Sequence, residues 1–147
     1  MMIIYTMGFA QKNAERFFNI IRENGIEILI DIRLNNKSQL AGFTKGNDLP
    51  FLLNEICDCK YVHKIDYAPT KEILSAYQKK EISWQEYEER FLPLIEKRKI
   101  ELDFENDFST YSKICFLCTE PTPEMCHRRL IAEYLEKKVT GSTIIHI

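Results

Sequence analysis

Features that would mark a membrane, secreted or strongly basic protein are missing from this sequence. No apolar run approaches the roughly 20 residues that span a bilayer, and polar residues follow the apolar start too soon for the core of a signal peptide. The 20 Lys and Arg residues and 22 Asp and Glu residues leave a formal net charge of −2, which provides no bulk attraction to nucleic acid or anionic lipid. We therefore expect a cytoplasmic protein without a membrane partner, in which any phosphate binding depends on a local basic patch.

Well-known catalytic and cofactor motifs are also missing. The chain contains no Walker loop, no dinucleotide-binding glycine fingerprint and no H-E-x-x-H or G-x-S-x-G motif. Its five cysteines are an odd number, which favours reduced thiols over a disulfide framework. Cys118, Cys126 and His127, with or without His63, offer soft ligands for zinc, but the Cys118-to-Cys126 spacing is wider than a zinc knuckle uses. We predict no cofactor, with a zinc-stabilised domain as an open alternative.

What is present is a regular alternation of β-prone and helical segments in 147 residues, which is enough for one domain over residues 1–147. The β-prone runs cover residues 2–7, 26–32, 59–65, 114–118 and 143–147. Helical patterns follow Asn13, Asp48, Thr70, a Ser83–Glu86 capping box and Thr122, with a further piece over 104–111 and a kink or division at Pro93. Strands separated by helices predict a three-layer α/β fold, with a mainly parallel sheet, helices on both faces and a helical insertion around residues 70–111.

The stretch from residue 114 to residue 129 gathers many of the reactive side chains. Its apolar run ends at Cys118, breaks at Pro121 and Pro123, and restarts as a helix that we expect Thr122 to cap. In open α/β sheets, ligands bind at the carboxyl ends of the strands, which is where this junction falls. The free N–H groups and the dipole at the start of the helix would lower the pKa of a thiol there, or would hold a phosphate group.

Parallel strands end at one edge of a sheet, so polar residues that follow different strands should meet in one pocket. We expect Asp31, Cys118 and His127 to share it. The candidate catalytic residues are Cys118 as nucleophile or polar contact, Glu120 and His127 as acid or base, and Asp31 as acid, base or orienter of an arginine. The candidate substrate-binding residues are Arg33, Arg128, Ser38, Lys45, Gly8 and His63.

Purely structural roles are open for some of the same residues. Cys118 could be a small buried hydrophobe, Asp31 could be the ion-pair partner of Arg33, and His63 could be a strand histidine whose hydrogen bonds are satisfied. The geometry of the fold has to decide between these alternatives.

Several of these residues form short motifs in a fixed order. The motifs are Thr6-x-Gly8, Asp31-x-Arg33, Ser38 followed by Gly42-Phe43, Cys118-x-Glu120, Cys126-His127-Arg128 and a closing His146-Ile147. This pattern resembles the domain-of-unknown-function family 488 of bacteria and archaea over nearly the whole chain, and most specifically in the last cysteine-histidine-arginine motif. It departs from the family where Phe9 and Ala10 replace a histidine or tyrosine and a serine, and where residues 36–39 replace a proline-serine-arginine run. The resemblance implies a three-layer α/β domain with a site built from these motifs, and it brings no established reaction.

Our leading hypothesis is an enzyme that acts on a phosphate-bearing or nucleotide-like substrate at the carboxyl edge of the sheet, with a small anionic or nucleotide-like ligand as its partner. The alternative from another class is a non-catalytic module that binds nucleic acid or a nucleotide. Its basic groove would consist of Arg33, Lys37, Lys45, Arg128 and Arg129. The sequence predicts no oligomeric state.

Overall fold

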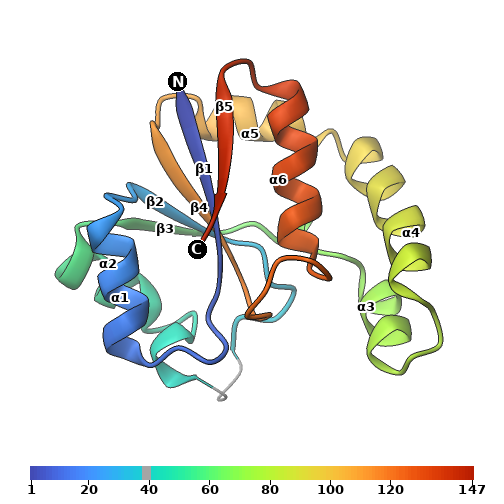
Figure 1. The fold of residues 1–147 in the computed structure, drawn as a ribbon, viewed down its shortest axis with the longest axis horizontal. Coiled ribbons are helices and arrows are strands. Elements are labelled where there is room, and N and C mark those ends of the chain that lie inside the picture. Colours follow the sequence, from blue (N-terminus) through green and yellow to red (C-terminus); the bar gives the residue numbers. More distant parts are fainter. Residues whose placement is uncertain (38–40) are drawn as a thin grey trace.

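A parallel five-stranded sheet forms the centre of the computed structural model, which describes residues 1–37 and 41–147 (Figure 1). The strand order is β3-β2-β4-β1-β5, and every neighbouring pair is parallel. The strands are β1 (Met2–Gly8), β2 (Ile28–Asp31), β3 (Lys60–His63), β4 (Lys113–Cys118) and β5 (Ser142–His146). Helices cover both faces, so the predicted three-layer α/β fold is confirmed, and each predicted β-prone run overlaps one strand.

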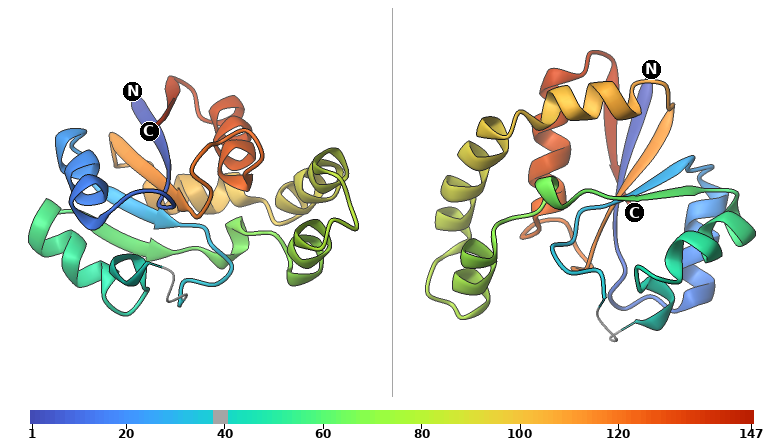
Figure 2. Two further views of the ribbon diagram at one scale, coloured as in Figure 1. Left: turned by 60° about the horizontal axis from the view of Figure 1, so that its bottom comes forward. Right: turned by 180° about the vertical axis from the view of Figure 1, so that it is seen from behind.

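One face of the sheet is covered by helices α1 (Ala14–Glu23) and α2 (Leu49–Cys57) (Figure 2). Helix α1 begins where the sequence predicts, because the Asn13 side chain accepts a hydrogen bond from the Arg16 backbone N–H. Asp48 occupies the cap position of α2, but its side chain makes no capping hydrogen bond. The apolar layer beneath these helices contains Phe17, Phe18, Ile21, Leu49 and Leu53, together with the strand residues that point to this face.

The predicted helical insertion lies between β3 and β4. It consists of α3 (Lys71–Gln78), α4 (Trp84–Lys97) and α5 (Ile100–Phe108). Thr70 caps α3, and Ser83 and Glu86 form the predicted capping box of α4. Of the kink or division predicted at Pro93, the division is wrong, because α4 continues through this residue, with Phe91 and Ile95 buried beside it. The chain breaks instead at Lys99, which has a left-handed backbone with φ of 53°.

The helix after β4 begins later than expected. We predicted a start at Pro123 with Thr122 as the cap, but α6 covers His127–Lys138 and Cys126 stands at its cap position without a side-chain hydrogen bond. Residues 119–126 form a loop whose last turn is closed by the Cys126 N–H, which donates to the Pro123 carbonyl at 3.2 Å. This segment therefore makes one isolated turn before the helix starts.

The carboxyl end of β4 is the point where connections diverge. The chain leaves β1 and β2 toward α1 and α2 on one face, and it leaves β4 toward α6 on the opposite face, where α5 also packs. Because β4 lies between β1 and β2, a crevice is expected at this edge of the sheet. Helices α3 and α4 extend beside α6, away from α1 and α2 (Figure 1). No helix in the described ranges combines the length and the apolar character needed to cross a membrane.

Candidate functional site

A cavity of about 540 Å³ lies at this divergence point. Segments far apart in the chain line it: residues 33–35 after β2, residues 118–120 and 125–127 around the β4–α6 loop, and part of the α3–α4 insertion. A cavity of this size suits a small molecule of nucleotide dimensions. The insertion therefore completes a site whose other side is the carboxyl edge of the sheet.

The insertion contributes an aromatic wall made of Tyr77, Trp84 and Tyr87. The Trp84 and Tyr87 rings are stacked with centroids 4.7 Å apart and an interplanar angle of 19°, and Tyr77 meets both rings edge-on. Sequence patterning indicates core packing for these residues, since they recur at helical spacing. Only the fold shows that they also face a cavity. Among the described residues, Trp84 Nε1 is the one buried side-chain nitrogen or oxygen without a hydrogen-bond partner.

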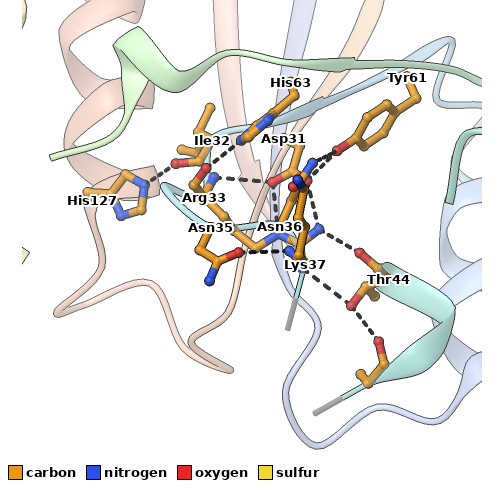
Figure 3. Close-up of polar contacts among 11 residues, drawn as sticks. Asp31, Ile32, Arg33, Asn35, Asn36, Lys37, Thr44, Tyr61, His63 and His127 are labelled. Atoms are coloured by element: carbon orange, nitrogen blue, oxygen red, sulfur yellow. Dashed lines mark hydrogen bonds and ion pairs between the residues drawn. The ribbon is translucent and has the colours of Figure 1, made fainter. Parts of the chain in front are cut away.

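The floor of the cavity contains Cys118 and His127, which are 6% and 7% exposed. Cys118 Sγ lies 3.5 Å from His127 Nδ1. His127 Nε2 lies 2.7 Å from the Ile32 carbonyl oxygen (Figure 3). Since a carbonyl can only accept, Nε2 must carry the hydrogen of this bond. The other ring nitrogen, Nδ1, faces the Cys118 sulfur.

The thiols of Cys118 and Cys126 have opposite pKa shifts. A hydrogen bond from Cys126, the backbone N–H groups of Thr119 and Glu120 and the charge of Arg128 lower the pKa of Cys118 despite its burial. The hydrogen bond to Cys118 and burial raise the pKa of Cys126. The floor therefore favours a Cys118 thiolate that accepts a hydrogen bond from the Cys126 thiol.

The other three cysteines lie outside the cavity lining. Burial raises the pKa of Cys57, raises the pKa of Cys115, and raises the pKa of Cys59 to about 12. All three are expected to stay protonated at neutral pH, which is typical of small structural side chains.

Asp31 lies behind the floor and holds Arg33. Asp31 is fully buried, and its two carboxylate oxygens accept from Arg33 Nε at 2.9 Å and Arg33 Nη2 at 2.7 Å (Figure 3). Tyr61 donates to the same carboxylate at 2.6 Å, and Arg33 Nη2 also donates to the Thr44 carbonyl at 2.6 Å. Burial opposes the charge of Arg33, but the hydrogen bonds and the charge of Asp31 outweigh it and raise the pKa of Arg33. Of the alternatives, the geometry matches Asp31 as the orienter of an arginine.

Arg128 joins three of the sequence motifs without lining the cavity. It is fully buried, and it donates from Nε to Thr6 Oγ1 at 3.2 Å and from Nη1 to the Glu120 carbonyl. Gly8 is close to the same carbonyl, because a Cβ atom at this position would overlap the Glu120 backbone. Thr6 Oγ1 lies 2.5 Å from His146 Nδ1, so the contacts continue to β5. Shared contacts of this kind tie the motifs together in the fold.

The remaining predicted residues are placed as follows. His63 Nε2 lies 2.6 Å from the Arg33 carbonyl and holds the chain after β2 (Figure 3). Glu120 is exposed and lines the cavity, whereas Lys45 is half-buried and does not. Ser38 lies outside the described residues. The cavity thus brings together Arg33, Cys118, Glu120 and His127, and it leaves out Asp31, Arg128, Gly8, His63 and Lys45.

The shared pocket expected for Asp31, Cys118 and His127 is therefore found for the last two only. Asp31 reaches them indirectly, because the carbonyl of the next residue, Ile32, binds His127. The hypothetical basic groove also loses members, since Arg33 and Arg128 are buried. Arg129, a third member, pairs with Glu88 at 2.9 Å and with Glu133 at 3.2 Å.

A metal ion would find soft ligands at the same floor. In the described parts of the chain, Cys118, Cys126 and His127 are the three side chains of metal-binding type whose ligand atoms all lie within 4.8 Å of one another. All three are buried, and all three line the cavity.

Comparison with known families identifies the chain. The family model described as Domain of unknown function DUF488 matches residues 13–135, so the protein belongs to this family. No curated protein and no solved structure matches the chain.

Proposed function

We propose that this DUF488 protein is an enzyme that acts on a nucleotide-like small molecule in the cavity between the α3–α4 insertion and the carboxyl edge of the sheet. The observation that carries the proposal is the two-sided lining of the cavity. An aromatic wall on the insertion and a floor with a thiol and an imidazole line the same cavity, with the Glu120 carboxylate at its rim. An apolar surface with a few convergent polar groups is typical of sites that orient a substrate for reaction.

The aromatic wall supports a ligand with a planar ring. Stacking of a nucleobase on an aromatic side chain contributes about 1–3 kcal/mol. Tyr77 and Trp84 are half-buried on the cavity side of the insertion, so their rings retain free surface for such a contact.

The first turn of α6 supports a negatively charged group next to the ring. Cys126 and His127, at its start, line the cavity, and no side chain caps the free N–H groups of this helix of 12 residues. A helix N-terminus stabilises a nearby anion by about 0.3–1 kcal/mol when exposed, and more when partly buried. We therefore propose the helix start as the anion-binding position, since the two arginines expected to clamp the anion are occupied by protein partners.

Three residues of the cavity lining are available for the reaction: Cys118, His127 and Glu120. Cys118 would act as nucleophile or polar contact, and His127 Nδ1 lies 3.5 Å from its sulfur. Glu120 is the exposed carboxylate at the rim, where it can exchange protons with a ligand. Because the aromatic residues would bind the ligand and Glu120 would transfer protons, mutations could affect binding and reaction separately.

The single tryptophan of the chain allows a direct binding test. Because Trp84 lines the cavity, nucleosides and nucleoside monophosphates that bind there should change its fluorescence in a saturable manner. Tyr77→Ala should weaken the affinity about 5–150-fold, which corresponds to the loss of about 1–3 kcal/mol of stacking. The control Phe51→Ala removes an aromatic ring that is 65% exposed on α2 and should leave the affinity unchanged.

Catalysis needs a separate readout. Bound nucleotides should be converted to a product detectable by chromatography, and Glu120→Gln should slow the conversion while the Trp84 response persists. If no member of the panel changes the fluorescence at millimolar concentration, the ligand class is wrong. Binding without any product would favour the non-catalytic nucleotide-binding module instead.

A further inference from the structure

We infer that Cys118, Cys126 and His127 bind a zinc ion at the floor of the cavity, with its fourth coordination position open to the ligand. The site itself stands on the geometry of these three side chains, and only its use in catalysis rests on the proposed function. Two thiolates and an imidazole are ligands that zinc prefers over hard cations.

The spacing of the ligand atoms fits a tetrahedral ion. With Zn–S near 2.3 Å and Zn–N near 2.0–2.1 Å, a sulfur and a nitrogen ligand lie roughly 3.5 Å apart. Cys118 Sγ and His127 Nδ1 are 3.5 Å apart. The set as a whole spans no more than 4.8 Å, so small side-chain rotations suffice to enclose an ion.

The orientation of His127 matches that of a metal ligand. In zinc sites, the histidine ring nitrogen that does not bind metal usually donates to a carbonyl or carboxylate, which fixes the ring and its tautomer. His127 Nε2 has this partner in the Ile32 carbonyl at 2.7 Å (Figure 3). The other nitrogen, Nδ1, lies 3.5 Å from Cys118 Sγ. The chain after β2 is itself held in place by the hydrogen bonds of Asp31 and His63.

The number of ligands indicates the kind of site. Structural zinc sites have four protein ligands, whereas catalytic sites have three and leave a position for water or substrate. The described residues supply three, all on the cavity lining. The open position would let an oxygen atom of the ligand's phosphate bind the ion inside the cavity.

The spacing along the sequence is no obstacle in this fold. Knuckle spacing is needed when a tight turn carries both cysteines, but here Cys118 ends β4, Cys126 precedes α6, and His127 begins it. The eight-residue separation is taken up by the loop that returns the chain to the end of its own strand. The fold therefore brings the three ligands together although their spacing in the sequence is not that of a zinc knuckle.

Metal binding is tested on the full chain, purified and kept reduced. Elemental analysis, and a Zn²⁺ titration of chelator-treated protein against a coloured chelator, should give one zinc per chain. Cys118→Ser and Cys126→Ser should each weaken zinc binding by more than the about 10–100-fold that loss of an outer-shell partner costs. Cys57→Ser removes a thiol outside the cluster and should bind zinc like the unmodified protein.

Cobalt provides a second readout that does not depend on the stability of a single variant. Co²⁺ added to the reduced protein should produce thiolate-to-cobalt absorption, which weakens in each single-serine variant and persists in Cys57→Ser. A folded, reduced protein that takes up no stoichiometric zinc would overturn the inference. Unchanged zinc affinity in Cys126→Ser would also overturn it. The inferred site needs Cys126 as its third ligand, whereas a pair of Cys118 and His127 alone does not.

The two proposals fail separately. Stoichiometric zinc with no Trp84 response to nucleotides would leave the metal site standing and remove the proposed ligand class. Nucleotide binding and turnover by a protein that takes up no zinc would support the proposed function and remove the metal site.

Discussion

Removal of the Asp31 carboxylate should destabilise the protein far more than removal of an exposed carboxylate. Four donor groups converge on Asp31: the Arg33 backbone N–H at 3.1 Å, Arg33 Nε at 2.9 Å, Arg33 Nη2 at 2.7 Å and the Tyr61 hydroxyl at 2.6 Å. Asp31→Ala leaves the Arg33 guanidinium, which is 4% exposed, without its counter-charge. The dominant cost is therefore an uncompensated buried charge.

The uncompensated charge of Arg33 sets the size of the expected loss in the free energy of unfolding. Breaking a buried ion pair from one side costs about 3–5 kcal/mol, which lowers the folding equilibrium constant about 100-fold to several-thousand-fold. With a urea slope of about 2 kcal/mol/M for a small domain, the unfolding midpoint should fall by roughly 1.5–2.5 M. Urea unfolding followed by circular dichroism measures this shift.

Two comparisons make this result decisive. Glu133→Ala breaks an exposed pair with Arg129, in which the glutamate side chain is 45% exposed, and should cost less than about 1 kcal/mol. The double change Asp31→Leu with Arg33→Met removes both charges and should cost less than the sum of the two single changes. An Asp31→Ala cost as small as that of Glu133→Ala, or strict additivity in the double variant, would refute the reasoning.

Two further predictions concern the contacts around β1. Burial, and then the nearby charge of Arg128, lowers the pKa of His146 from 6.5, so its NMR titration should have a midpoint below 6.5. As the pH falls, the unfolded chain binds a proton at His146 before the folded chain does. The free energy of unfolding should therefore decrease as the pH drops below about 6.5 and level off below the folded-state pKa. His146→Gln should remove this contribution to the pH dependence of stability. Gly8→Ala should cost at least about 1–3 kcal/mol in urea unfolding because its Cβ would overlap the Glu120 backbone, whereas Gly42→Ala has open space and should change stability by less than about 1 kcal/mol.

Much of the fold can be predicted from local patterns in the sequence. The apolar runs mark the strands because buried parallel strands are apolar on both sides, and Asn13, Thr70 and Ser83 mark helix starts because their side chains bond to backbone N–H groups. The start of α6 could not be predicted in this way, because Thr122 and Pro123 have the form of a helix start but close only an isolated turn.

The candidate site could also be predicted only in part from the sequence. That Cys118, Glu120 and His127 follow a strand end is a property of the sequence, and it is enough to predict that they meet at the sheet edge. Whether an arginine faces a ligand or the protein depends on partners far away in the chain: Thr44 accepts from Arg33, and Thr6 accepts from Arg128. The aromatic wall depends on how the insertion folds back toward that edge, since one helical spacing serves both a core face and a cavity wall.

The sequence by itself therefore determined the strands, the helices and the edge where polar groups collect, because these follow from neighbouring residues. Tertiary structure alone decided which of those groups remain free for chemistry, because that depends on contacts between residues distant in the chain.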